Sequence, residues 1–388
     1  MGVDAPQRLR ALDGLRGLSA LLVCLFHFPA AGPIAETALV RGGWLAVDFF
    51  FLLSGFVIAA GWGGRLNGAA DLPRFFILRL ARIWPLHAAM LLLFLAVELV
   101  GAALGGGGLM QRAPFGAGHG LGDWWRSLFL LGAFGLTDGE VWNVPAWSIA
   151  AEFWSWVIFG ISWVWGGPQR VWLLAGLALL SWALMHADGG GIARTFDGGF
   201  IRALCGFFAG ALLQSVPHRA WRSGRGAPLF ATAVEAGALL LVFAFIAAAP
   251  ASPTNLAAPL VFGLAVHVFA RGDGLISRLL KTAPLQRLGL LSSALYLVHT
   301  FVQARLGDAL VLLPRLVEGT PQLLTKANGK DVFGRTSFEG VMLTGVMLAL
   351  TMAAAGLAWR LVEEPVRTAA RRRWLYPARA SSTLTAEP

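Results

Sequence analysis

The chain has 388 residues, of which 57% are hydrophobic and only 13% are charged. Ordinary soluble domains carry about 25% charged residues, so this composition excludes most soluble folds. The net charge of +10 would suggest a nucleic-acid partner in a soluble protein. In a membrane protein it is explained by basic cytoplasmic loops, and no nucleic acid is expected.

Ten apolar runs are long enough to cross a bilayer as helices of about 20 residues. They are 12–30, 44–62, 83–104, 145–165, 170–187, 199–216, 229–250, 255–270, 285–306 and 341–362. The expected fold class is therefore an all-α integral membrane protein. One membrane domain is expected over 1–370, followed by a basic and then polar tail at 371–388 that we expect to be disordered.

A shorter apolar run lies at 124–137. A run of about 10–14 residues is more typical of a re-entrant or interfacial helix than of a span. Loop charge favours the same interpretation, because counting this run as an eleventh span would put the later basic clusters outside, against the positive-inside rule.

With ten spans, the basic clusters fall on one side of the membrane, together with both termini. They are Arg8 and Arg10; Arg65, Arg74, Arg79 and Arg82; Arg219, Arg222 and Arg225; Arg271, Arg278, Lys281 and Arg287; and Arg371, Arg372 and Arg373. The sequence thus predicts a multi-pass protein of the cell (inner) membrane with both termini in the cytoplasm. Of the outer segments, 307–340 is the one long enough to shape an external site.

The first run contains two polar groups, Arg16 and His27. They are eleven residues apart, which is about three helical turns, so they share one face roughly 16 Å apart. A charge at bilayer depth costs at least about 2.5–3.5 kcal/mol, so such residues are functional candidates. They also argue against a signal peptide that is removed.

The second and fourth runs contain the carboxylates Asp48 and Glu152. Asp48 is expected at the depth of His27, where it could orient the imidazole of a general base. The alternative, that Asp48 meets a helix N-terminus or another cation, stays open. Glu152 follows Ser148 by four residues, so both share one helix face.

The ninth run carries a polar stripe of Ser292, Tyr296 and His299, at i, i+4 and i+7. Such a stripe is more typical of hydrogen bonds between helices than of catalysis. Before the third run, Arg79 and Arg82 lie one turn apart on one face. Paired guanidinium groups suit phosphate oxygens, although simple anchoring at the membrane surface is the open alternative. The two cysteines have no metal-ligand spacing, and no metal is expected.

Six motifs in order resemble the membrane-bound acyltransferase 3 family. They are Arg16 and His27 separated by ten residues; Asp48-Phe-Phe with Ser54-Gly55-Phe56; Arg79-Leu-Ala-Arg82-Ile-Trp-Pro85; Trp147-Ser148 with Glu152; Tyr296-Leu297-Val298-His299; and Glu363-Glu364-Pro365. Each motif alone is weak, but their order over residues 8–367 is specific.

The resemblance implies an O-acyltransferase with ten spans that uses acyl-CoA, by default acetyl-CoA, as a cosubstrate and holds no cofactor tightly. The acceptor would be a hydroxyl of a sugar or glycan on the other side of the lipid bilayer. His27 would be the catalytic base, with Asp48 or Glu152 holding its imidazole. Arg79 and Arg82, grouped with Arg16, would bind the donor.

The remaining candidates, Ser148, Tyr296 and His299, are expected to bind the acceptor or to support the fold. The chain lacks the C-terminal hydrolase-like domain of some relatives, so transfer is expected to finish in the membrane domain or to involve a separate transferase partner. A proton-coupled transporter or flippase is the rival hypothesis, and it leaves Arg79 and Arg82 unexplained. A scaffold without chemistry would leave the buried ionisable groups unexplained.

Overall fold

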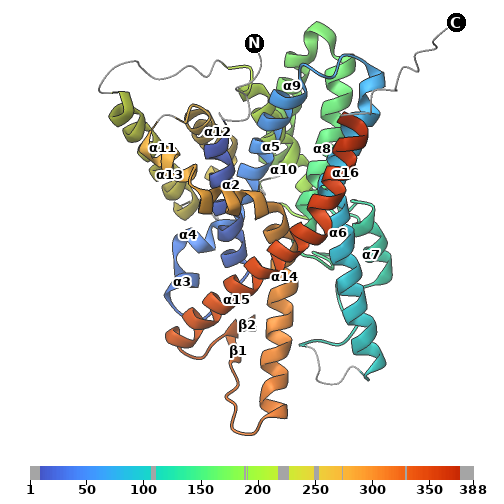
Figure 1. Cartoon of the computed structure of the whole chain (residues 1–388), viewed down its shortest axis with the longest axis vertical. Helices are drawn as coiled ribbons and strands as arrows, with labels where there is room; N and C mark the ends of the chain where they lie inside the picture. The colour runs from blue at the N-terminus through green and yellow to red at the C-terminus, as the bar shows by residue number, and fades with distance from the viewer. Residues whose placement is uncertain are drawn as a thin grey trace, which may run out of the picture.

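The computed structural model describes residues 9–375 except 106–110, 188, 190, 217–226, 249–252, 273 and 328–329. The chain is almost entirely helical (Figure 1). The α-helices are α2 (Arg10–Phe26), α3 (Pro33–Glu36), α4 (Ala38–Arg41), α5 (Ala46–Trp62), α6 (Leu72–Ala103), α7 (Leu121–Leu128), α8 (Ala146–Trp165), α9 (Arg170–Ala187), α10 (Gly199–Leu213), α11 (Ala227–Ala248), α12 (Ala258–Phe269), α13 (Leu275–Leu280), α14 (Ala283–Leu316), α15 (Ser337–Ala358) and α16 (Glu364–Leu375). The strands β1 (Leu324–Ala327) and β2 (Lys330–Phe333) form an antiparallel hairpin at the end of the bundle opposite α16.

Each of the ten expected apolar runs coincides with a helix, which confirms an all-α architecture. Five helical stretches within the described residues have the length and hydropathy of membrane spans. They are Gly43–Trp62, Ala69–Ala103, Gly167–Ala187, Pro228–Ala248 and Ser337–Leu375. The apolar helices Gly199–Leu213 and Pro253–Phe269 are shorter. The chain is therefore a helical membrane protein.

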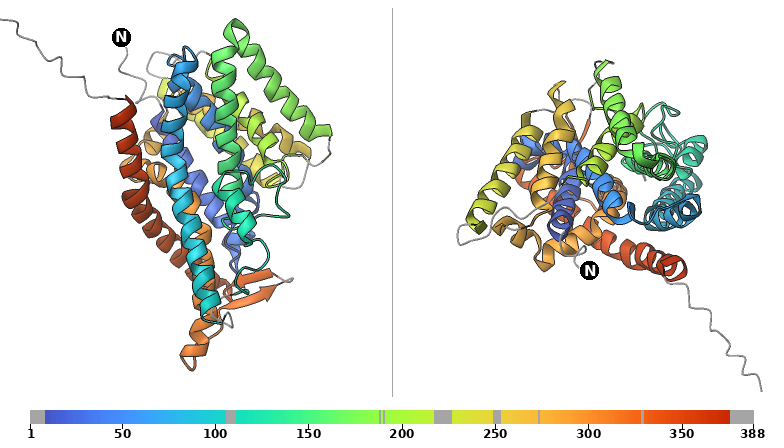
Figure 2. Two further views of the ribbon diagram at one scale, coloured as in Figure 1. Left: turned by 90° about the vertical axis from the view of Figure 1, so that its right-hand side faces the viewer. Right: turned by 90° about the horizontal axis from the view of Figure 1, so that it is seen from above.

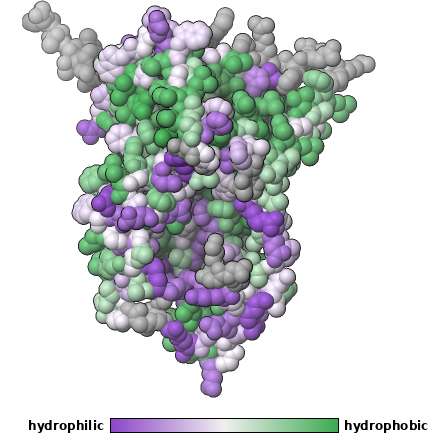
Figure 3. All heavy atoms as spheres, turned by 180° about the vertical axis from the view of Figure 1, so that it is seen from behind, coloured by the Kyte–Doolittle hydropathy of each residue, from purple (hydrophilic) through white to green (hydrophobic). Residues whose placement is uncertain are grey.

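The surface matches this assignment. The helix α5 is largely buried inside the bundle, whereas α9 and α11 are mostly exposed. Their exposed side chains are large and apolar, for example Trp172 and Leu229. Figure 3 shows a broad hydrophobic surface on the upper part of one face, with hydrophilic side chains gathered lower down. Helices α15 and α16 lie along the outside of the bundle (Figure 2).

The short run at 124–137 is helical only in its first five residues, which belong to the eight-residue α7, while 129–137 form turns and loop. Such a helix is about 12 Å long, far less than the roughly 30 Å of a bilayer core. It packs on α6, because the Trp124 indole donates to the carbonyl of Leu91 and the His87 ring lies 2.8 Å from the carbonyl of Ser127. The run 124–137 is therefore not a membrane-spanning helix.

Helices α2 and α14 run parallel to each other. Arg10 bonds to Gln286, Arg16 to Ser292 and Gln303 to Cys24, so the two helices advance together at a nearly constant sequence offset. This register brings polar side chains of the two helices into contact along most of the length of α2.

Helices α5 and α10 also run parallel, and two glycines let them approach closely. A Cβ at Gly55 would overlap the carbonyl oxygen of Phe207, and a Cβ at Gly210 would overlap that of Leu52. Small residues allow membrane helices to pack backbone against backbone. This contact sets the rotation of α5 and α10 and hence which of their polar side chains meet.

The expected tail needs a correction at its start. Helix α16 continues to Leu375 and includes Arg371, Arg372 and Arg373, so the basic part is helical rather than disordered. The polar part at 376–388 lies outside the described residues, as do Arg8 and the cluster of Arg219, Arg222 and Arg225.

Candidate active site

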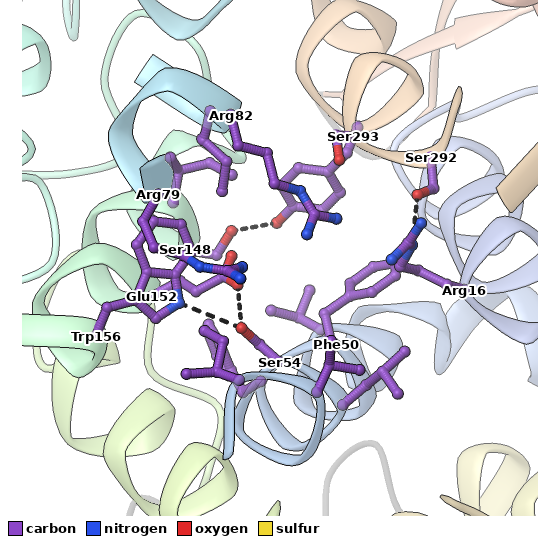
Figure 4. A pocket seen from close by; sticks show the side chains of 18 of the residues that line it. Arg16, Phe50, Ser54, Arg79, Arg82, Ser148, Glu152, Trp156, Ser292 and Ser293 are labelled. Carbon is purple, nitrogen blue, oxygen red and sulfur yellow. Dashed lines mark hydrogen bonds between the residues drawn. The ribbon is translucent and has the colours of Figure 1, made fainter. Parts of the chain in front are cut away.

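A pocket opens between helices α2, α5, α6, α8 and α14 (Figure 4). It contains about 790 Å³ of empty space, including open solvent at its mouth. One part of its wall is apolar, with Val47, Phe50 and Ile58 from α5. The other part is polar and contains most of the residues selected from the sequence.

Three arginines from two helices point into this pocket: Arg16 from α2, and Arg79 and Arg82 from α6. Arg16 is held in place, because its Nε donates to Ser292 Oγ at 2.9 Å and its Nη2 donates to the carbonyl of Gly289 at 2.9 Å. Ser292, the first residue of the polar stripe on α14, thus holds the Arg16 side chain in place.

Arg79 and Arg82 are held differently. Neither has a carboxylate within 4 Å among the described residues, and the buried Nε of Arg79 has no hydrogen-bond partner there. The Arg79 guanidinium lies 5.9 Å from the ring centre of Trp156. A buried polar group without a partner is unfavourable, so the Arg79 side chain keeps unused hydrogen-bonding capacity beside the pocket.

Glu152 is the one carboxylate among the described residues that line the pocket. Its Oε1 accepts from Ser54 Oγ at 2.5 Å, and the Trp156 indole donates to the same Ser54 oxygen at 3.3 Å. The expected contact of Glu152 with His27 is not formed. Glu152 instead partly neutralises the arginines and fixes the hydroxyl of Ser54.

Ser148 and Tyr296 form the next part of the wall, with their hydroxyl oxygens 2.6 Å apart. The Ser148 hydroxyl donates to the carbonyl of Pro145 at 2.9 Å, so the Tyr296 hydroxyl must donate to Ser148. Both side chains are buried. This pair joins α8 to α14 between the arginines and the histidines described next.

His27 and His299 lie side by side, at the C-terminal end of α2 and on α14. The nitrogen His299 Nε2 is 3.3 Å from His27 Nδ1, and the ring centres are 5.1 Å apart. His27 is not among the residues that line the pocket. It is connected to the pocket wall through His299, whose ring centre is 6.0 Å from that of Tyr296.

Asp48 does not orient His27, which corrects the interpretation drawn from depth. Its carboxylate accepts from Arg202 Nε at 2.9 Å and from Nη2 at 2.7 Å. The other Arg202 donors reach the carbonyls of Arg194 and Trp44. The guanidinium also lies between the rings of Trp44 and Trp147, at 5.0 and 5.4 Å. The open alternative, that Asp48 pairs with another cation, is the correct one.

Arg202 was missed in the sequence, although a signal was present: a lone arginine in the apolar run 199–216. Ser54 was read only as part of a motif and Trp156 was not selected. Glu235, a buried carboxylate inside α11, lies outside the site. It accepts from the backbone of Gly274 and from both the backbone and the hydroxyl of Ser277, and so holds the start of α13.

The fold and the pocket define a membrane protein in which three half-buried arginines face a cavity next to a histidine pair. A family model described as an acyltransferase domain, Acyl_transf_3, matches residues 9–360. The chain therefore belongs to the acyltransferase 3 family, a family of enzymes that transfer acyl groups.

Two curated proteins are similar to the chain. Acyltransferase MdmB of Streptomyces mycarofaciens is 28% identical over an alignment of 404 positions, which covers 94% of each protein. "Protein 2 in picA locus" of Rhizobium radiobacter is 39% identical over 100 residues, which cover 25% of this chain and 49% of that protein. The chain thus matches about half the length of the Rhizobium protein. No solved structure matches the chain.

Proposed function

We propose that this protein is a membrane-embedded O-acyltransferase that moves an acyl group, by default acetyl, from cytoplasmic acyl-CoA to a hydroxyl of a sugar or glycan. The observation that carries the proposal is the position of Arg79 and Arg82, which are half-buried and line a pocket without an ion-pair partner among the described residues. The pocket wall continues through Tyr296 to the His27 and His299 pair.

The donor fits this pocket by charge and by shape. Coenzyme A carries several phosphate groups, and a guanidinium can bind phosphate oxygens through two parallel hydrogen bonds. Arg79 and Arg82 are one turn apart on α6, and Arg16 faces them from α2. The pantetheine arm is uncharged and suits the apolar wall formed by Val47, Phe50 and Ile58.

In the proposed reaction, His27 removes the proton from the acceptor hydroxyl as its oxygen attacks the thioester carbonyl. The new C–O bond forms, the C–S bond breaks, and the CoA thiolate leaves and takes up the proton from the imidazolium. A well-placed general base contributes about 10²- to 10⁴-fold in rate. The donor is bound from the cytoplasmic side of a ten-span bundle, and the acceptor reaches His27 from the other side.

The test uses inside-out vesicles from cells that produce the protein, supplied with radiolabelled acetyl-CoA. Label in the glycan and lipid-linked sugar fractions is counted, and free CoA thiol is measured in parallel. We expect label transfer and thiol release to fall to background in His27→Ala. The matched control is His186→Ala, since His186 stacks on Trp182 at an exposed position on α9.

Full activity of His27→Ala would refute the assignment of the base. A pH-dependent flux of labelled sugar without release of CoA thiol would replace the acyltransferase proposal by the transporter alternative. Mass spectrometry of the labelled fraction identifies both the acyl group and the acceptor.

A further inference from the structure

The hydrogen bonds of His299 determine where its proton lies. Its Nδ1 is 3.1 Å from the carbonyl oxygen of Leu295, and a carbonyl can only accept. Nδ1 therefore carries a hydrogen. His299 is fully buried and has no carboxylate within 4 Å among the described residues, so an imidazolium there would be an unpaired buried charge. In the neutral ring, Nε2 is then a hydrogen-bond acceptor.

The same reasoning determines the tautomer of His27. Its Nδ1 faces two acceptors, the carbonyl of Val23 at 3.0 Å and Nε2 of His299 at 3.3 Å. Nδ1 must carry a hydrogen to bond to either, so in the neutral ring Nε2 has a free lone pair. His27 also keeps part of its surface exposed, whereas His299 does not. A general base needs this combination: an accessible nitrogen without a proton, on a ring held from its other side.

We propose that His299 is a positioning residue for His27, and this proposal rests on the acyltransferase function proposed above. His299 accepts the Nδ1 hydrogen of His27, which leaves Nε2 of His27 as the atom that takes the proton from the acceptor hydroxyl. His299 thereby does the work that a carboxylate does in a Ser-His-Asp triad. In this protein Asp48 does not fill that role, because Arg202 occupies both of its oxygens.

The bond between the two rings changes during the reaction. When Nε2 of His27 takes up the proton, the ring becomes cationic and Nδ1–H becomes a charged donor. Hydrogen bonds with one charged partner are roughly twice as strong as neutral ones. His299 therefore binds the imidazolium more tightly than the neutral base, and it supports the proton transfer without placing a buried negative charge beside the base.

His299 is itself fixed by its neighbours on α14. Its Nδ1 bonds to the helix carbonyl one turn earlier, and the ring packs near Tyr296, which donates to Ser148. One turn later, Gln303 donates to the carbonyl of Cys24 on α2. Gln303 thus supplies another buried bond between the same two helices that does not involve the His27 ring.

The experiment compares three variants in the labelled-acetyl transfer assay. We expect His299→Leu to lower kcat by about 10²-fold, within the range of a general base that has lost its positioning, with KM for acetyl-CoA unchanged. His299→Gln keeps an acceptor oxygen near the position of Nε2 and should regain about tenfold in kcat over His299→Leu. Gln303→Leu removes a bond of similar burial and should keep wild-type kcat. A thermal unfolding scan with each variant measures its folding.

Two results would overturn the proposal: kcat of His299→Leu equal to wild type, or equal loss in His299→Leu, His299→Gln and Gln303→Leu. A second measurement does not depend on activity. Nitrogen-15 NMR of histidine-labelled protein in liposomes should find His27 protonated on Nδ1 and unprotonated on Nε2. The opposite tautomer refutes the positioning role even in an active enzyme. A wild-type protein that transfers no acetyl group but has the expected tautomer would contradict only the proposed function.

Discussion

Two groups of charges inside the helix bundle differ in how they are satisfied: one is buried and the other is half-buried beside a pocket. The pair of Asp48 and Arg202 is closed: both carboxylate oxygens are occupied, and Arg202 donates from Nε, Nη1 and Nη2 between two tryptophan rings. The pair of Arg79 and Arg82 is open, without an ion-pair partner among the described residues and with a pocket in front of it. Buried charge therefore does not by itself mark a functional site.

The two pairs differ in which group neutralises the charge: another side chain of the protein in the closed pair, and a ligand in the open pair. A closed ion pair brings two helices, α5 and α10, into one fixed arrangement, and its removal should affect folding. An open cation is left for a ligand, and its removal should affect binding. Each of the following substitutions tests one side of this comparison, beginning with the largest effect.

The largest effect is expected from Asp48→Ala. Removing one partner of a buried ion pair typically costs about 3–5 kcal/mol, because the other charge stays buried and unpaired. We expect a large fall in the melting temperature of the purified protein and a low yield of folded protein. The double variant Asp48→Leu with Arg202→Met should recover much of this loss, because neither charge then remains.

Asp48→Ala also tests the role of Asp48 in catalysis. The structure predicts that the folded fraction of this variant keeps the kcat of wild type. A normal melting temperature combined with a large loss of kcat would instead restore Asp48 as the partner of His27, and the closed pair would have to be reinterpreted.

An intermediate effect is expected from Arg79→Gln and Arg82→Gln. A hydrogen bond to a charged group contributes about 1.5–3 kcal/mol, so the Kd for acetyl-CoA should rise roughly 10- to 100-fold for each. The melting temperature should not fall, since neither arginine has an ion pair to lose among the described residues. Binding is measured by calorimetry, with acetyl-pantetheine, which lacks the CoA phosphates, as the second donor.

The affinity for acetyl-pantetheine should be unchanged in both variants. Arg74→Gln is the matched control, because Arg74 lies on the same helix α6 but does not line the pocket. If both donors lose affinity equally, the arginines support the pocket wall and do not bind phosphate.

The smallest effect is expected from Glu152→Gln. This change removes the one carboxylate among the described pocket residues but keeps an oxygen that can accept from Ser54. The pocket becomes more positive, and the affinity for acetyl-CoA should rise by up to about tenfold, on the order of 1 kcal/mol. Titration with labelled acetyl-CoA measures this Kd. A weaker Kd would indicate that Glu152 contacts the donor directly.

Much of the architecture was predictable from the sequence. The ten apolar runs all form helices, and the eight residues of α7 agree with the expectation that 124–137 does not span. Helix ends were predicted less well. Helix α6 begins at Leu72 rather than near residue 83, because Arg74, Arg79 and Arg82 interrupt the apolar residues of its first turns and break the apolar run.

The sequence predicted those features of the site that depend on a single helix, such as which side chains share one face. The spacing of Arg79 and Arg82 placed both on one face of α6, and the stripe of Ser292, Tyr296 and His299 lies on one side of α14, where it reaches Arg16, Ser148 and His27. Helical periodicity determines such faces without reference to the rest of the fold. The family resemblance, carried by short motifs in order, was likewise contained in the sequence.

Only the tertiary structure decided which buried group meets which. Asp48 pairs with Arg202, Glu152 with Ser54, and His27 with His299. Depth along a helix was known from the sequence, but the partner depends on how neighbouring helices are rotated. That rotation is set by contacts such as Gly55 against Phe207, where two backbones touch because side chains are absent. Charge and depth were therefore properties of the sequence, whereas pairing was a property of helix packing.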